Sequence, residues 1–292
     1  MLFRRRTSLT PARAAALAGI LRAPTFELVP LKNALDQAGF LPAGATVSVT
    51  ASPAKGIEAT VALCEQLQAR GFRAVPHLSA RMIRDRAHLT ELIAWLEGTG
   101  VDRAFVVGGD AKEPGEFPDG LSLLRAMAEI GHPLAEIGIP CYPQGHAFIA
   151  DAPLLEALRA KASFASYMTT QLCFDPGAIK TWLADRRAEG IDLPVHVGLP
   201  GVAEPQRLLA ISARIGVADT HRFLVKNTAF IARLIRSGGF YRPDGLLEGL
   251  APVIADPAAG IVDMHLYTFN AVDVTERWRQ EFLARHAAAL VA

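Results

Sequence analysis

The sequence has little net charge, few cysteines and no long apolar run. Its 30 Lys and Arg residues balance 29 Asp and Glu residues, which leaves a net charge of +1 over 292 residues. Nucleic-acid-binding proteins normally carry a basic excess, so the charge gives no support for that class of partner. No stretch approaches the ~18 consecutive apolar residues of a membrane span. With 51% apolar residues, the chain has material for a large buried core.

The three cysteines, Cys64, Cys141 and Cys173, lie far apart and form no CxxC pair. Their number and spacing argue against a disulfide framework and a structural zinc site, and we expect buried thiols in a reducing compartment. The basic start MLFRRR is separated from the apolar stretch 14–21 by Pro11 and Arg13, unlike a signal peptide. We therefore predict a cytoplasmic protein whose first helix follows a frayed tail over residues 1–10.

Short β-branched apolar runs alternate with longer amphipathic segments along the chain. The apolar runs predict eight strands, at residues 25–29, 46–50, 74–78, 103–107, 136–140, 167–172, 194–198 and 261–267. The amphipathic segments predict helices at residues 58–70, 85–96, 121–130, 153–162, 178–189, 204–215, 219–235 and 274–290. Several of these segments end at a glycine that suits a helix C-cap, such as Gly71.

Eight strands that alternate with helices indicate a parallel sheet with crossover helices. Eight such units in about 250 residues match the size of a (β/α)8 barrel. The alternative is a doubly wound sheet, whose first turn usually carries a GxGxxG sequence that this chain lacks. Since no linker divides the sequence, we predict one domain over residues 1–292, a single (β/α)8 TIM barrel with an N-terminal helix.

Polar residues close almost every predicted strand. They are Glu27, Thr50, His77, Asp110, Tyr142 with His146, Gln171, and Tyr267 with Asn270. Because barrel enzymes build their active sites at the carboxyl ends of the strands, we expect these side chains to converge. Such a set suits a large, flat ligand that forms hydrogen bonds.

Two acidic residues stand out in this set. Glu27 lies inside the apolar run 26–30, where a carboxylate is costly to bury unless it is paired. A general acid and a structural ion pair, with Lys32 or an arginine, both account for it, and the strand-end position favours the acid. Asp110 follows two glycines and is either an acceptor for a heterocyclic ligand or a turn residue.

The amide of Gln171 offers a donor and an acceptor, which match the amide edges of pterins, flavins and nicotinamide; capping of the next helix is the alternative. His77 alone is more often a core residue than a catalyst. The eight histidines are scattered without metal-ligand spacing, so we predict no metal site. The basic residues Arg222, Lys226, Arg233 and Arg236 share a helix face that is either solvated or an anion site.

Seven segments at these strand ends resemble motifs of methylenetetrahydrofolate reductases, barrel enzymes that reduce 5,10-methylenetetrahydrofolate to 5-methyltetrahydrofolate. The matches follow the family's order over residues 24–285. They are TFELVPLK for FE-x-x-PPK, VSVTASPAKG for VTYGAGG, PHLSA for AHLTC, VGGD for LRGD, YPQGH for YPEGH or YPEVH, MTTQLCFD for ITQ-x-FFD, and HLYTFN for HFYTLN.

The resemblance implies a role for each matched residue. Glu27 takes the place of the family's catalytic acid, which protonates N10 of the folate so that the imidazolidine ring opens to a 5-iminium cation. Asp110 takes the place of the Asp that stabilises this cation, and Gln171 and Tyr267 are further substrate-binding positions. The positions that correspond to cofactor contacts are Thr50, His77, Gly109, Tyr142, His146 and Arg159.

Several family contacts to FAD are changed in this sequence. Gly108 replaces the Arg of LRGD, Pro53 removes a backbone donor, and Ala271 replaces the Arg after HFYTLN. The helix at 153–162 keeps Arg159 but has Glu156 where the family has Asn. Each lost charge-assisted hydrogen bond to a diphosphate costs ~1.5–3 kcal/mol, so the changes weaken FAD binding.

We therefore expect an oxidoreductase of folate one-carbon metabolism, a divergent methylenetetrahydrofolate reductase that uses NADH or NADPH and transfers hydride directly where FAD is absent. The alternative function is a folate-binding barrel in one-carbon transfer that is not a reductase. Expected partners are folate and a nicotinamide dinucleotide. The sequence does not choose between NADH and NADPH, or between methionine biosynthesis and one-carbon assimilation, and it leaves homo-oligomerisation open.

Overall fold

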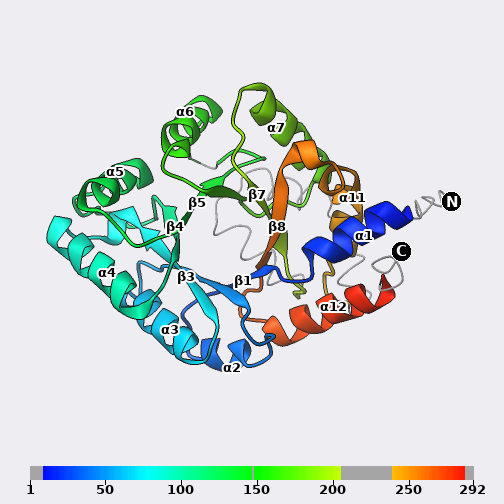
Figure 1. Ribbon diagram of the computed structural model, residues 1–292, viewed down its shortest axis with the longest axis horizontal. Helices are drawn as coiled ribbons and strands as arrows, with labels where there is room; N and C mark the ends of the chain where they lie inside the picture. Colours follow the sequence, from blue (N-terminus) through cyan, green and yellow to red (C-terminus); the bar gives the residue numbers. More distant parts are fainter. Residues whose placement is uncertain (1–8, 147, 205–238, 287–292) are drawn as a thin grey trace.

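The computed structural model describes residues 9–146, 148–204 and 239–286. Eight parallel strands close into a barrel in the order of the sequence, surrounded by helices (Figure 1). The strands are β1 (Thr25–Leu28), β2 (Thr46–Val49), β3 (Arg73–Ser79), β4 (Arg103–Val107), β5 (Glu136–Cys141), β6 (Tyr167–Thr170), β7 (Val195–Pro200) and β8 (Ile261–Tyr267). The predicted (β/α)8 TIM barrel with an N-terminal helix is confirmed.

The helices that cover the barrel begin with side-chain caps at several strand-to-helix turns. Asp85, Asp119 and Asp175 each accept a hydrogen bond from a backbone N–H of the first helical turn, the usual role of an N-cap. The α-helices are α1 (Pro11–Ile20), α2 (Ala34–Ala38), α3 (Glu58–Ala69), α4 (Arg86–Thr99), α5 (Gly120–Ile130), α6 (Asp151–Ala162), α7 (Pro176–Ala188), α11 (Asp244–Ile254) and α12 (Val272–Arg285). Short 3-10 turns are η1 (Ala80–Met82) and η2 (Pro257–Ala259).

The predicted strands agree with the observed ones to within two residues at each end. Two helices, α2 and α11, were not predicted. Helix α11 contains Pro252 and two glycines, which read as breakers in the sequence, yet Gly249 lets the helix approach Pro176 at the start of α7. The predicted helix 219–235 with its basic face, most of the helix 204–215, and residues 1–8 of the predicted tail lie outside the described residues.

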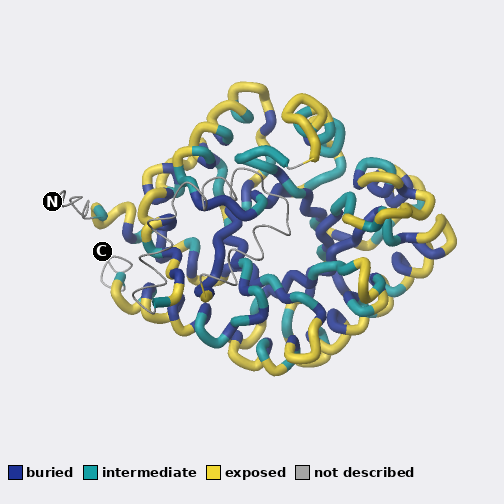
Figure 2. The backbone as a smooth tube through the Cα atoms, turned by 180° about the vertical axis from the view of Figure 1, so that it is seen from behind, coloured by how far each residue is buried: buried dark blue, intermediate teal, exposed yellow. Residues whose placement is uncertain are grey.

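Apolar side chains fill both the space between barrel and helices and part of the barrel interior. Figure 2 shows the buried strands at the centre and the exposed outer faces of the helices. Inside the barrel, Val75, Phe105 and Tyr167 form a cluster of their own. Gly138 lies under this cluster, where any Cβ would collide with the rings of Tyr167 and Phe105. Within the described residues, no helix has the length and apolar character to cross a membrane.

The barrel closes between β1 and β8, and a buried arginine reinforces this seam from outside. Arg279 of α12 is 2% exposed and forms two hydrogen bonds of 2.6 and 2.7 Å to the carboxylate of Glu276. Its remaining nitrogen donates to the carbonyl oxygens of Leu21 and Arg22, just before β1, at 2.8 and 3.0 Å. A buried ion pair with satisfied donors thus connects α12 to the segment that leads into the first strand.

Candidate active site

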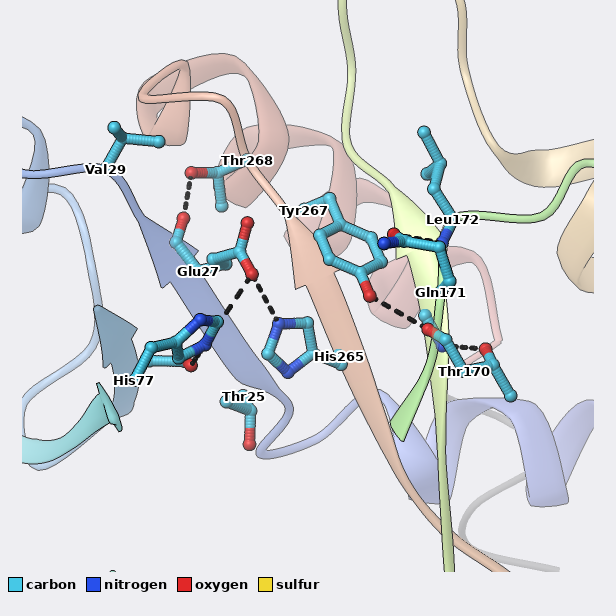
Figure 3. Close-up of polar contacts among 12 residues, drawn as sticks. Thr25, Glu27, Val29, His77, Thr170, Gln171, Leu172, His265, Tyr267 and Thr268 are labelled. Carbon is cyan, nitrogen blue, oxygen red and sulfur yellow. Dashed lines mark hydrogen bonds and ion pairs between the residues drawn. The ribbon is translucent and has the colours of Figure 1, made fainter. Parts of the chain in front are cut away.

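Glu27 lies at the end of β1 inside the barrel, and its nearest polar partners are histidines (Figure 3). Its side chain is 13% exposed, and Oε2 lies 3.2 Å from Nε2 of His265 and 3.9 Å from Nε2 of His77. Nε2 of His77 is also 2.7 Å from the hydroxyl of Ser48. Burial lowers the pKa of His77 to about 4, against the opposing effect of Glu27. The predicted alternative, an ion pair with Lys32 or an arginine, does not occur among the described residues.

The turn after β8 fixes the end of β1 that carries Glu27. The hydroxyl of Thr268 donates to the backbone oxygen of Glu27 at 2.5 Å. The side-chain amide of Asn270 accepts from N–H of Val29 at 2.8 Å and donates to its carbonyl at 2.9 Å, as a neighbouring strand would. Phe269 and Asn270 have φ values of 53° and 55°, an uncommon backbone for residues other than glycine. Asn270 therefore has a structural role: it holds the backbone of Val29 next to Glu27.

Tyr267 reaches across the barrel from β8 to β6. Its hydroxyl donates to the carbonyl oxygen of Thr170 at 2.8 Å, and its ring covers Gly198 of β7, where a Cβ would collide with the ring. Burial, reinforced by the charge of Glu27, raises the pKa of Tyr267 well above its usual range. The phenol therefore remains neutral, and its place beside a substrate stays a prediction.

Asp110, Tyr142 and His146 form a second group at the carboxyl end of the barrel. The rings of Tyr142 and His146 meet edge to face at 5.1 Å between centroids. Burial raises the pKa of Tyr142 to about 12 and lowers that of His146, and the charge of Asp110 acts on both groups. Asp110 itself is exposed, at the start of the loop between β4 and α5. The exposed carboxylate is available to a ligand that binds over the barrel.

Arg81, which the sequence reading did not single out, holds the loop that carries Asp110. Its guanidinium donates to the carbonyl oxygens of Ala111, Lys112 and Pro118 at 2.6, 2.9 and 3.4 Å. Its own N–H donates to the carbonyl of Gly108 at 3.0 Å. One side chain therefore fixes both ends of the loop. An arginine that follows a strand is too common a feature to have revealed this role in advance.

Gln171 and Thr50 occupy strand ends as predicted, with their backbone paired to neighbouring strands. N–H of Gln171 donates to the carbonyl of Cys141 at 2.8 Å, and its side-chain oxygen accepts from N–H of Leu172 at 2.7 Å. This bond fixes the orientation of the amide. Thr50 is half-buried, and its N–H donates to the carbonyl of Leu28 at 2.9 Å.

Arg159 is not brought together with the other predicted residues. It lies in the last turn of α6, more than two helical turns from the carboxyl end of the barrel toward its amino end, and forms an ion pair of 3.3 Å with Glu189 after α7. A cleft of about 440 Å³ does separate α6 from α7, next to Tyr142, and its cations are Lys161 and Arg186. Asp151 and Asp185 also line it, so the cleft carries both signs of charge.

The residues present do not fit the diphosphate of FAD as the family binds it. Gly108 offers no guanidinium, and the one retained cation, Arg159, is engaged by Glu189. The left-handed Gly109, with φ of 88°, packs on this chain's own Ser79, whose hydroxyl occupies the place of a Cβ. Between Ser52 and Gly56, the N–H groups of Lys55 and Gly56 bond to the carbonyl of Ser52.

Three further polar residues, His196, Asp263 and His265, lie inside the barrel below Glu27, and they were not predicted from the sequence as site residues. Asp263 accepts from the hydroxyl of Thr25 at 2.8 Å, and its carboxylate lies 3.7 Å from Nδ1 of His196. Asp263, His265 and Tyr267 alternate along β8, so their side chains share the inward face. This alternation could have revealed from the sequence that Asp263 and His265 lie on the same face as Tyr267. In the described part of the chain, no group of three His, Cys, Asp or Glu residues has the arrangement of a metal site.

Comparison with known families identifies the class of protein. The sequence model of the methylenetetrahydrofolate reductase family matches residues 30–217. The chain therefore belongs to this family of folate-related reductases. The matched span contains most of the predicted site, from Thr50 to Gln171, whereas Glu27 and Tyr267 lie outside it.

Solved structures of low sequence identity also resemble the chain. Dihydropteroate synthase (FolP) from Thermus thermophilus is 15% identical, with a TM-score of 0.46, and the match covers 92% of this chain and 95% of that one. A putative lyase/mutase from Burkholderia cenocepacia is also 15% identical, with a TM-score of 0.44, and the match covers 97% of this chain and 90% of that one.

Proposed function

We propose that the protein reduces 5,10-methylenetetrahydrofolate to 5-methyltetrahydrofolate with NADH or NADPH as the hydride donor. The observation that carries the proposal is the environment of Glu27. This carboxyl group is 13% exposed at a strand end, and its ion-pair partners among the described residues are two histidines and no permanent cation. A carboxylate without a Lys or Arg partner is free to take up and release a proton, as a general acid must.

In this proposal, each site residue performs one part of an acid-assisted reduction. Glu27 donates its proton to N10, so that the C–N10 bond breaks and a 5-iminium cation forms. The exposed carboxylate of Asp110 stabilises that cation, and the NH2 group of Gln171 donates to the pterin edge. Hydride then reduces the iminium carbon to a methyl group. Substrate, reduced nicotinamide and one proton are consumed, which balances the reaction.

We further propose that hydride passes directly from the nicotinamide to the folate. The altered diphosphate contacts around Gly108 and Arg159 support this version, because they leave FAD without the cations that hold it in the family. Thr50, Tyr142 and His146 would then line the nicotinamide instead of a flavin. The two substrates must be bound together, so initial-rate plots should show intersecting lines and not parallel ones.

An absorption spectrum tests the cofactor, and an assay tests the reaction. The purified protein, before and after incubation with excess FAD and desalting, should show no flavin bands and should still oxidise NADH or NADPH when methylenetetrahydrofolate is added. Flavin at about one per chain would contradict direct transfer and leave the reductase intact. Absence of folate-dependent oxidation, with or without FAD, would contradict the reductase itself.

The second candidate function is a folate-binding barrel in one-carbon transfer. The same altered FAD contacts favour it, because a protein without hydride chemistry has no need of a flavin. Tight folate binding without any oxidation of NADH or NADPH would support it, whereas oxidation that depends strictly on methylenetetrahydrofolate would exclude it.

A further inference from the structure

The barrel interior below Glu27 holds a line of buried titratable groups that the proposed reaction does not yet use. His265 lies directly below Glu27 and is 3% exposed. Asp263 lies two residues before His265 on β8, and His196 lies beside Asp263 on β7. Buried polar groups of this kind are expensive unless they are paired or have a function.

The contacts join these groups in two pairs, His265 with Glu27 and Thr25 with Asp263, and the strand register places the pairs side by side. Nε2 of His265 is 3.2 Å from Oε2 of Glu27, and the second ring nitrogen lies on the side of Thr25 (Figure 3). Thr25 is the β1 partner of His265 in the barrel register, and its hydroxyl donates to Asp263 at 2.8 Å. A single water between Thr25 and His265 would complete a path for a proton from Asp263 to Glu27 inside the barrel.

We propose that Asp263 and His265 supply Glu27 with the proton that it gives to the folate in each turnover. This inference rests on the proposed reductase function. After Glu27 has lost its proton to N10, the imidazolium of His265 transfers one to the Glu27 carboxylate. The carboxylic acid of Asp263 then restores the His265 proton, and the Asp263 carboxylate takes a proton from solvent. Both residues act through Glu27 and are positioning residues for it, not catalytic residues.

The reaction needs such a supply because it consumes one proton per turnover. Folate and nicotinamide, bound together over the carboxyl ends of the strands, would cover the direct route from solvent to Glu27. Asp263 lies on the opposite side of Glu27, and its side chain retains 20% exposure. The inner half of the barrel therefore offers a route that remains open while both substrates are bound.

The charged and titratable neighbours are consistent with a proton donor at Asp263. Burial raises its pKa to about 6, against the hydrogen bonds from Thr25 and Met264 and the charges of His265 and Arg103. His196 stacks on Tyr167 at 4.0 Å between centroids, and burial lowers its pKa to about 3, so it stays neutral. His265 itself faces Glu27, His77, Tyr267 and this lower layer.

The decisive experiment measures kcat, KM and their pH dependence for Asp263→Asn, with Glu129→Gln as a control. Glu129 is an exposed carboxylate of α5 that pairs with Arg86 at 2.9 Å, outside the barrel. Asp263→Asn should lower kcat ~10-fold or more at pH 7 with KM for folate nearly unchanged, as expected for loss of a proton donor. Added formate, a small exogenous acid, should restore part of the rate in Asp263→Asn only.

Three results would overturn the proposal. They are an unchanged kcat in Asp263→Asn across pH 5.5–8.5, a KM that rises as much as kcat falls, and a failure of formate to restore any rate. Infrared titration supplies a readout without turnover: a carboxylic acid band that disappears near pH 6 in the wild type must be missing in Asp263→Asn, and its absence from the wild type would refute the donor. A wild type that shows this band but no folate-dependent oxidation would refute the reductase and, with it, the use of the line.

Discussion

Glu27 combines burial with partners that are themselves weak bases. A lysine or arginine at hydrogen-bond distance would hold the carboxylate ionised, and a buried carboxylate without any partner would be costly. The histidines at 3.2 and 3.9 Å avoid both extremes, because they contact the carboxylate without the permanent positive charge of a lysine or arginine. The hydroxyl of Thr268 and the amide of Asn270 fix the backbone, so the carboxyl group has a defined position.

Replacement of Glu27 by glutamine tests this residue. Glu27→Gln keeps the shape and polarity of the side chain but cannot donate a proton with useful acidity, so kcat should fall ~10²–10⁴-fold. Folate affinity, measured by calorimetry, should change little. Glu129→Gln, at an exposed carboxylate of α5, is the control, with kcat near that of the wild type. Near-normal turnover in Glu27→Gln would remove the residue from its role as the acid.

At the residue scale, the sequence predicted the strand-end positions better than the partners of each side chain. Glu27, His77 and Tyr267 do meet inside the barrel, as residues at carboxyl strand ends should. His265 was overlooked, although it lies two residues before Tyr267 and therefore on the same face of β8. Arg159 was predicted at the site because of its position in the helix that corresponds to a family FAD contact. It lies in the last turn of α6, and the length of this helix separates it from the other predicted residues.

At the element scale, the loop between β4 and α5 depends on Arg81. Three carbonyl oxygens of the loop accept hydrogen bonds from its guanidinium, and Gly108 accepts one from its backbone. The loop has no helix or strand of its own, so these bonds determine where Asp110 lies. Arg81 thus organises the loop from η1, the 3-10 turn that follows the neighbouring strand β3.

Replacement of Arg81 should therefore disturb folate binding more than global stability. Arg81→Gln should raise KM for methylenetetrahydrofolate ~10-fold, equivalent to about 1.4 kcal/mol, because Asp110 is no longer held in place. Arg81→Lys should restore only part of this, since an ammonium group cannot donate in a fork. Arg86→Gln, which removes an exposed ion pair to Glu129, is the matched control. An unchanged KM together with a lower melting temperature would show that Arg81 has only a structural role.

The elements themselves were largely predictable, and the exceptions have physical causes. A strand that is buried on both faces appears in the sequence as a continuous apolar run, which is why β4, with Ala104, Phe105 and Val106 buried, was predicted to the residue. The bounds of β8 were also predicted, although this strand carries Asp263 and His265 and its Val262 is exposed. Helix α11 has weak propensity because of Gly245, Gly249 and Pro252, and it forms because its apolar face packs against α1 and α7. Such tertiary stabilisation is not visible in a local window.

At the scale of the whole molecule, closure of the barrel between β8 and β1 brings Glu27 and His265 together. Arg279 strengthens that seam, because it connects α12 to the carbonyl groups of Leu21 and Arg22 through a buried pair with Glu276. Arg279→Ala should lower the free energy of unfolding by ~3–5 kcal/mol, since it leaves a buried carboxylate without a partner. Urea denaturation measures this change.

The control for this prediction is Arg285→Ala, which removes an exposed cation paired with Asp244. Its effect should stay below about 1 kcal/mol. Equal effects of the two substitutions would contradict a special role of the Arg279 pair in closing the barrel.

The pH dependence of stability follows from the buried interior groups. His77 and His196, with pKa values of about 4 and 3, take up protons more readily in the unfolded chain, so stability falls as pH drops below about 6.5. Asp263, with a pKa raised to about 6, acts in the opposite direction, because its contribution is lost as pH rises from about 4 to 6. Asp263→Asn should therefore steepen the rise of stability between pH 4 and 6 by about 1.4 kcal/mol per pH unit. Urea titrations at several pH values measure the slope, and an unchanged slope would contradict the buried acid.

The central claim, direct reduction of a folate by a nicotinamide, is tested best by isotope transfer. The reaction is run in ordinary water with NADH or NADPH that carries deuterium at the transferred position of C4, and the product is analysed by mass spectrometry. Direct transfer predicts one deuterium in the methyl group of nearly every 5-methyltetrahydrofolate molecule. Transfer through a flavin would pass through an N5–H group that exchanges with water, so a product methyl group without deuterium would contradict the account.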